Sequence, residues 1–144
     1  PNTCGVKSCA QEILALGTPL LYWSITLSLF VVIGIWIKSR DITASILLTV
    51  IGAGYLPWFF FQKRTMFNFY TISFEPFLVL ILVYLFGRYL ANSKSPEDLS
   101  KRKSVLVALS VFYLACFLYF LPFYYGQTIP YISWSDHMWL PSWI

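Results

Sequence analysis

Charged residues are scarce in this sequence. Asp, Glu, Lys and Arg make up 11% of its 144 residues, whereas a soluble domain carries about 25%. Hydrophobic residues supply 58% and aromatic residues 20%, so the composition argues against a soluble fold. The formal net charge of +4 does not indicate nucleic-acid binding, because the basic residues form short clusters between long apolar runs.

Motifs that carry known chemistry are also missing. The sequence has no glycine-rich phosphate loop and no Ser/His/Asp arrangement. Asp136 and His137 are neighbours, but such a pair is common in loops. Cys4, Cys9 and His137 have suitable ligand types for zinc, yet four ligands in a recognised spacing are absent. We therefore expect no metal, no cofactor and no catalytic residue in this sequence.

Four apolar runs are long enough to cross a membrane. A hydrocarbon core of about 30 Å needs roughly 20 mostly apolar residues in a helix, and runs of this kind occupy residues 20–37, 42–61, 70–86 and 104–124. None alternates with a period of two, and isolated strands would leave backbone groups unpaired in lipid. The sequence predicts an all-α integral membrane fold with four transmembrane helices within residues 19–125.

The placement of Lys and Arg predicts the orientation. The first and third interhelical loops contain Lys38, Arg40, Arg88, Lys94, Lys101, Arg102 and Lys103, and the opposite side contains Lys7, Lys63 and Arg64. Because Lys and Arg are enriched in cytoplasmic loops, both termini are expected to be extracytoplasmic. A disulfide between Cys4 and Cys9 is chemically sensible on that side.

Two flanking segments complete the predicted organisation. Residues 1–18 form the end of an extracytoplasmic loop, and residues 126–144 form an extracytoplasmic aromatic tail whose tryptophans are suited to the membrane interface. Gly52 and Gly54 in the second run would allow close approach of another helix. Since the sequence begins with Pro1 rather than Met, without the pattern of a signal peptide, we expect it to be a fragment.

Polar residues gather near the second extracytoplasmic loop. Lys63 and Arg64 could hold a phosphate group, or they could be an ordinary interfacial pair that reaches lipid headgroups. Glu75 could face the bundle interior, or it could simply begin a helix beside Pro76, where the helix dipole favours negative charge. Both alternatives remain open at this stage.

Three separated segments resemble a known family. Residues 12–23, residues 64–70 with 74–77, and residues 122–131 with 139–144 resemble the C-terminal four-helix region of bacterial protein O-mannosyltransferases. The stretch around Cys4 and Cys9 is similar to the actinobacterial branch. The resemblance implies a multi-pass glycosyltransferase of the bacterial plasma membrane that moves mannose from polyprenyl phosphate mannose to Ser or Thr of exported proteins.

The resemblance also implies roles for particular residues. The acidic catalytic pair of the family lies in an earlier extracytoplasmic loop that this sequence lacks, so the isolated chain is expected to be inactive. Arg64, with Lys63, would lie near the donor phosphate, and Tyr70 and Glu75 would shape the same region. The implied partners are the lipid bilayer, the donor lipid, exported acceptor proteins and the missing N-terminal helices of the same enzyme.

A second function remains compatible with the residues. The chain could be a non-catalytic four-helix scaffold or assembly subunit whose aromatic tail binds a partner or the membrane surface. A transporter subunit fits less well, because polar residues within the apolar runs are few and are mostly Ser or Thr, whereas transport paths usually need ionisable groups near the bilayer midplane.

Overall fold

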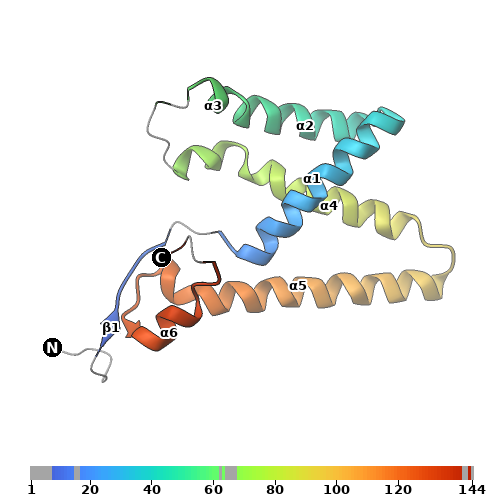
Figure 1. Ribbon diagram of the computed structural model, residues 1–144. Coiled ribbons are helices and arrows are strands. Elements are labelled where there is room, and N and C mark those ends of the chain that lie inside the picture. The colour runs from blue at the N-terminus through green and yellow to red at the C-terminus, as the bar shows by residue number, and fades with distance from the viewer. Residues whose placement is uncertain (1–7, 15–16, 62, 64–67, 141–142, 144) are drawn as a thin grey trace. The chain divides into compact units, whose positions relative to one another are not determined.

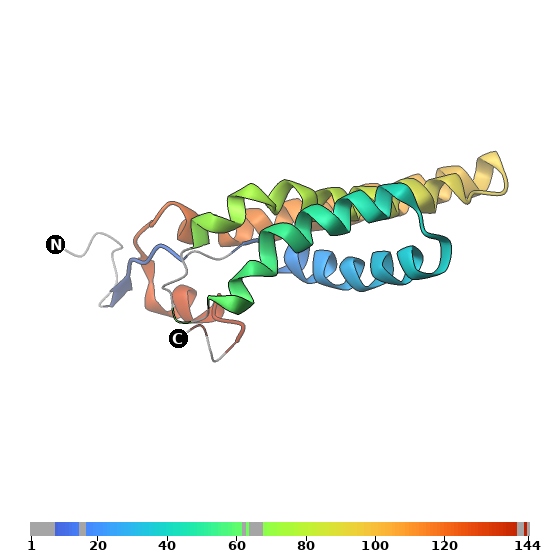
Figure 2. The same ribbon diagram turned by 90° about the horizontal axis from the view of Figure 1, so that it is seen from above.

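The computed structural model describes residues 8–14, 17–61, 63, 68–140 and 143, and helices account for most of them (Figures 1 and 2). The elements are β1 (Cys9–Ala10), α1 (Pro19–Ser39), α2 (Ile42–Tyr55), α3 (Pro57–Phe60), the 3-10 helix η1 (Asn68–Ser73), α4 (Glu75–Ala91), α5 (Pro96–Tyr124), β2 (Ile129–Pro130) and α6 (Tyr131–Asp136). The chain forms two compact units. We call Leu20–Ser110 the central unit, and Pro1–Pro19 with Val111–Ile144 the terminal unit.

Three helical stretches are long and apolar enough to cross a membrane. They are Pro19–Ser39, Ile42–Phe60 and Pro96–Tyr124, and they correspond to three of the four predicted runs. The remaining run, residues 70–86, overlaps α4, which has 17 residues and a length of about 26 Å at 1.5 Å per residue. The predicted helical membrane class is confirmed to this extent, and the crossing by α4 stays a prediction.

In the central unit, α1, α2 and α4 share a small apolar core. Its buried members are Val32, Ala44, Leu47, Ile51 and Ile81. Helices α2 and α4 lie side by side in both views (Figures 1 and 2). Large apolar side chains also point away from this core: Leu27 and Phe30 on α1 are 68% and 67% exposed. Such an apolar exterior suits helices whose surroundings are lipid.

The third run begins as a helix later than predicted. The sequence predicted a helix from residue 70, but residues Asn68–Ser73 form η1 and α4 begins at Glu75. Pro76 lies in the first turn of α4, where its missing N–H and fixed φ are tolerated, whereas it would disrupt a helix that continued from upstream. The proline therefore sets the start of α4.

The polar stretch 88–103 is mostly helical, although we predicted it to be a loop. Helix α4 continues to Ala91, and α5 begins at Pro96, which leaves residues 92–95 as the connection. The Ser95 hydroxyl accepts a hydrogen bond of 3.1 Å from the Asp98 N–H, and Glu97 and Asp98 occupy the first turn. A serine cap, a proline and early acidic residues together stabilise a helix start.

The terminal unit contains a short antiparallel strand pair that the sequence did not predict. Cys9 lies opposite Pro130, and Ala10 lies opposite Ile129. Two hydrogen bonds extend this contact: the Tyr131 N–H donates to the Ser8 carbonyl over 3.3 Å, and the Gln11 amide donates to the Gly126 carbonyl over 2.9 Å. The segment before α1 is thereby attached to the segment after α5.

Gly54 permits close packing between α2 and the start of α4, and Gly52 does not face the same neighbour. A Cβ at Gly54 would lie 2.7 Å from the Phe74 ring, whereas a Cβ at Gly52 would meet only Leu56 of its own helix at 3.6 Å. We expect Gly54→Ala to destabilise the protein by about 1–3 kcal/mol, as overpacking does. Gly52→Ala should be neutral or stabilise by up to about 1 kcal/mol.

Thermal unfolding of the two variants in one detergent measures this difference. The midpoint for Gly54→Ala should fall below that of the unaltered protein while the midpoint for Gly52→Ala does not. Equal midpoints for both variants would contradict the close approach of Phe74 to Gly54.

Candidate functional site

The predicted site lies where the chain passes from α2 to α4. At this end of the helix pair, the Tyr55 ring packs edge-on against Phe59 at 5.5 Å and against Phe74 at 6.1 Å between ring centres. The Trp58 indole donates a hydrogen bond of 3.0 Å to the Gly54 carbonyl. The contact between Tyr55 and Phe74 joins the C-terminal end of α2 to the N-terminal end of α4. The connection between the two helices therefore starts and finishes at the same end of the central unit.

We call Lys63, Arg64, Tyr70 and Glu75 the outer mouth. Lys63 follows α3 in a turn and is exposed, and Glu75 is the first residue of α4 and is partly buried. Arg64 lies outside the described residues, and Tyr70 is described only as part of the backbone of η1. Lys63 therefore lies on the connection between α3 and η1, and Glu75 lies at the start of α4. The grouping of the four residues into one site stays a prediction.

Glu75 lies at the start of a helix beside Pro76, as one of its two interpretations predicts. It follows the N-cap residue Phe74 and precedes Pro76 in the first turn of α4. A carboxylate there interacts favourably with the positive end of the helix dipole. The location accounts for a glutamate at the edge of an apolar run without requiring that it face the bundle interior.

The cysteines fall in different parts of the terminal unit. Cys9 belongs to β1, and Cys116 is a buried free thiol in α5. Cys4 lies outside the described residues, so the Cys4–Cys9 disulfide stays a prediction. The burial of Cys116 suits cysteine as a small apolar residue.

His137 has a structural environment that the sequence did not reveal. It is 6% exposed, and its ring nitrogens lie 2.6 Å from the Ser133 carbonyl oxygen and 2.9 Å from the Tyr119 carbonyl oxygen. The Tyr119 hydroxyl in turn donates to the Asp136 carbonyl over 3.2 Å. Since both ring nitrogens already face backbone oxygens, the geometry favours holding the tail against α5 over acid–base chemistry or zinc binding.

Aromatic rings surround His137. Its imidazole stacks on Tyr119 with 4.0 Å between ring centres and also meets Phe120 at 5.6 Å and Phe123 at 4.9 Å. Phe120 is fully buried and packs edge-on against Trp139 at 4.9 Å. The last turns of α5 and the tail therefore form one aromatic cluster, which gives the tail a defined conformation.

The N-terminal segment is bonded to this tail. The Trp134 indole donates a hydrogen bond of 2.9 Å to a carboxylate oxygen of Glu12. Together with the β1–β2 pair, this bond holds the residues around Glu12 beside the residues that follow α5. Their juxtaposition could not be read from the sequence, because Glu12 and Trp134 are 122 positions apart.

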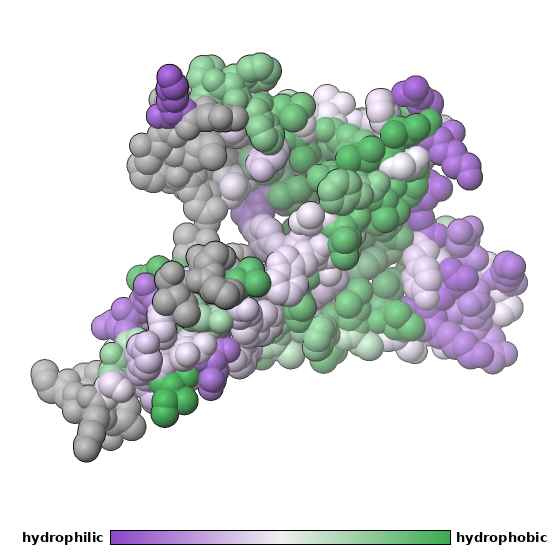
Figure 3. Space-filling view, in the orientation of Figure 1, coloured by the Kyte–Doolittle hydropathy of each residue, from purple (hydrophilic) through white to green (hydrophobic). Residues whose placement is uncertain are grey.

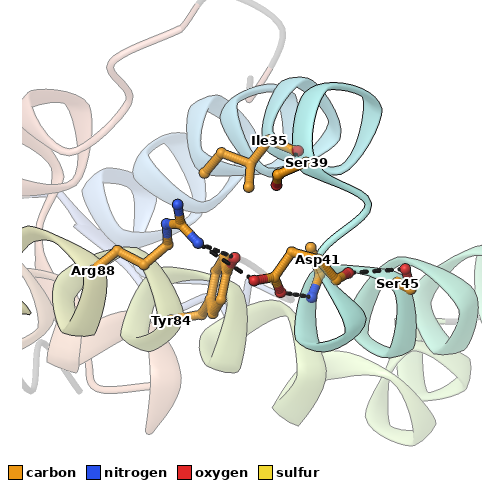
Figure 4. Close-up of polar contacts among 7 residues, drawn as sticks. Ile35, Ser39, Asp41, Ser45, Tyr84 and Arg88 are labelled. Atoms are coloured by element: carbon orange, nitrogen blue, oxygen red, sulfur yellow. Dashed lines mark hydrogen bonds and ion pairs between the residues drawn. The ribbon is translucent and has the colours of Figure 1, made fainter.

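A second polar cluster lies at the other end of the α2–α4 pair. Asp41 caps α2 by accepting a hydrogen bond of 2.9 Å from the Ala44 N–H, and it pairs with Arg88 of α4 at 3.4 Å (Figure 4). Arg88 also donates to the Tyr84 hydroxyl over 3.0 Å. The Ala44 N–H is the main cause of a lowered pKa for Asp41, and the Arg88 charge lowers this pKa further.

The two ends of the central unit differ in the pairing of their charged residues. Asp41 is satisfied by a helix cap and an ion pair, so its role is structural. Lys63 at the opposite end is exposed, and no ion pair involves it among the residues that the structure describes. An exposed cation beside a helix connection can bind an anion, which is the chemistry expected of the outer mouth.

Comparison with known proteins confirms the family resemblance. Proteins named polyprenol-phosphate-mannose–protein mannosyltransferase are 32% identical over 97% of this chain in Mycolicibacterium smegmatis, 28% over 94% in Corynebacterium glutamicum and 30% over 97% in Mycobacterium tuberculosis. The chain spans 26–27% of the length of these relatives. No family model matches the sequence, and no solved structure matches it.

Proposed function

We propose that this chain, which is similar along nearly all of its length to about a quarter of three mannosyltransferases, is the C-terminal membrane domain of an enzyme of that kind. The full protein would transfer mannose from polyprenyl phosphate mannose to Ser or Thr of exported proteins. The observation that carries the proposal is this similarity over 94–97% of the chain. Several long apolar helices support a location in a membrane.

The proposed topology has four crossings of the bacterial plasma membrane, with both termini outside. Asp41 and Arg88 meet at one end of the α2–α4 pair, and Tyr55 and Phe74 meet at the other. If α2 crosses the bilayer, α4 returns beside it, and the outer mouth then lies on the side opposite the cation-rich loops. The excess of Lys and Arg in those loops assigns them to the cytoplasm.

The outer mouth is proposed to bind the donor phosphate. Breaking the sugar–phosphate bond increases the negative charge on the leaving phosphate, and a fixed guanidinium stabilises that charge. Arg64 has the planar fork for two parallel hydrogen bonds to phosphate oxygens, and Lys63 supplies a second positive charge. Tyr70 and Glu75 would shape the surrounding surface.

The catalytic carboxylates are proposed to lie elsewhere in the full protein. In the described part of the chain, the acidic side chains with recorded partners serve helix caps, ion pairs or the Trp134 bond. If the catalytic carboxylates lie in other segments, the chain alone should not transfer mannose. Its contribution would be a binding surface and a membrane scaffold for the remaining helices.

A transfer assay tests this function. The full-length protein that contains this sequence and the isolated 144-residue chain would each be given radiolabelled polyprenyl phosphate mannose and a Ser/Thr-rich acceptor peptide. We expect transfer by the full-length protein only. No transfer by the full-length protein would favour the scaffold function, and transfer by the isolated chain would contradict the assignment of catalysis to other segments.

A further inference from the structure

Cations gather at the end of the central unit where α1 meets α2 and α4 meets α5. This end carries the seven basic residues of the first and third loops together with Asp41, Glu97 and Asp98, and Figure 3 shows hydrophilic residues concentrated there. Arg88 links α4 to α2 through Asp41, and the Arg102 guanidinium donates to the Tyr89 carbonyl of α4 over 2.7 Å. The two connections therefore belong to one polar surface.

The three carboxylates of this surface already have cationic partners. Arg88 pairs with Asp41 at 3.4 Å, Lys101 pairs with Glu97 at 3.0 Å, and Arg102 pairs with Asp98 at 3.0 Å. Four exposed cations have no ion pair within the described ranges: Lys38, Arg40, Lys94 and Lys103. We call these four residues the basic patch, and their charge is available to an external anion.

Arg40 has a left-handed backbone conformation that arginine rarely adopts. Its φ of 52° lies in the left-handed region, which glycine or asparagine usually occupies after a helix because a larger side chain is disfavoured there. Its guanidinium lies 4.8 Å from the centre of the Trp36 ring. An arginine at a position suited to glycine suggests that the cation itself is required.

The surroundings of Lys38 and Arg40 indicate a lipid partner. The adjacent side chains of Ile37 and Ile42 are 62% and 76% exposed, so the cations border an apolar surface that suits acyl chains. Trp36 beside them has the amphipathic ring typical of the headgroup region. A soluble anion would use the charges but would gain nothing from the exposed isoleucines.

We propose that the basic patch binds the headgroups of anionic phospholipids. The lipid phosphate contacts Lys38 and Arg40, and its acyl chains cover the neighbouring isoleucines. Lys94 and Lys103 add positive potential on the other connection. This inference concerns the lipids around the protein and does not depend on mannose transfer or on which side of the membrane faces the cytoplasm.

Native mass spectrometry of the full-length protein in detergent tests the proposal with two lipids, phosphatidylglycerol and phosphatidylcholine. Each cation near an anionic lipid surface contributes roughly fivefold to binding. The double variant Lys38→Gln/Arg40→Gln should therefore bind phosphatidylglycerol about tenfold or more weakly, with little change for phosphatidylcholine. The control variant Lys101→Gln, which removes an exposed cation that already pairs with Glu97 at 3.0 Å, should change phosphatidylglycerol binding less than about twofold.

Arg40→Gly distinguishes the effect of the lost charge from an effect on folding, because glycine accepts the left-handed conformation. This variant should keep the thermal midpoint of the unaltered protein and still lose about fivefold in phosphatidylglycerol affinity. Unchanged affinity in both Arg40→Gly and the Lys38/Arg40 double variant would overturn the proposal. Displacement of phosphatidylglycerol by millimolar inorganic phosphate would also overturn it, because the site would then accept a soluble anion.

Discussion

If the proposed function holds, Arg64→Ala in the full-length protein is expected to lower the turnover of mannose transfer by about 100-fold or more. Removing one group that stabilises developing negative charge typically has an effect of this size. The loss should appear in kcat more than in KM, since the phosphate gains charge as the sugar–phosphate bond breaks. Initial rates measured over a range of polyprenyl phosphate mannose concentrations separate the two constants.

Three further variants test whether the loss of turnover is due to the guanidinium of Arg64. Arg64→Lys should recover part of the activity, because it restores the charge without the two-pronged hydrogen bonding of arginine. Lys63→Ala should have a smaller effect than Arg64→Ala. Lys101→Ala should match the unaltered enzyme, since its side chain is 74% exposed and pairs only with the exposed Glu97. Unchanged turnover and donor affinity in Arg64→Ala would remove the proposed role.

Phe120→Ala is expected to lower the free energy of unfolding of the terminal unit by about 3–5 kcal/mol, the usual loss when a buried Phe is truncated. Phe120 is fully buried, and its ring packs against Trp139 at 4.9 Å and Trp143 at 6.3 Å. The cavity would remove the main support of the tail. Amide hydrogen exchange in α6 should accelerate by about 100-fold or more, which corresponds to that loss of free energy.

Phe112→Ala on the same helix is the matched control. Phe112 is 57% exposed, so its truncation creates no buried cavity in the terminal unit, and exchange in α6 should remain unchanged. If Phe120→Ala left α6 as protected as in the unaltered protein, the aromatic cluster would not be what holds the tail.

Helix positions were largely predictable because they depend on local apolar length. The runs at 20–37 and 42–61 correspond to the candidate spans Pro19–Ser39 and Ile42–Phe60. The start of α5 was wrong by eight residues, because we took the polarity of residues 96–103 as the sign of a loop. The sequence Ser95-Pro96-Glu97-Asp98 is itself a helix-start signal, and it should have outweighed that polarity.

The terminal unit could not be predicted because its contacts join distant segments. His137 bonds to the carbonyl of Tyr119, and Trp134 bonds to Glu12. No local pattern specifies such partners, and adjacent Asp136 and His137 look like any polar pair in a loop. The spacing of Tyr119, Phe120 and Phe123 near the end of α5 is a weak signal that this helix end packs against aromatic residues of the tail.

For the candidate site, the structure describes the positions of Lys63 and Glu75 along the chain, and the grouping of the site residues stays a prediction. Lys63 was predicted between two apolar runs and lies in a turn after α3, and Glu75 was predicted near the start of the next run and is the first residue of α4. The roles of Arg64 and Tyr70 depend on side-chain geometry, which a family resemblance cannot supply. The pairing of Asp41 with Arg88 was missed because it requires the antiparallel packing of α2 and α4.

The most direct test of the central claim is cysteine labelling of the full-length protein in intact bacteria with a membrane-impermeant maleimide. Lys63→Cys, Glu97→Cys and Asp136→Cys would each be made in a background whose native cysteines are replaced by serine. Four crossings with both termini outside predict labelling at positions 63 and 136 and none at 97 until the cells are opened. Labelling at 97 with protection at 63 and 136 would contradict the orientation, and equal labelling at 63 and 97 would contradict the crossing by α4.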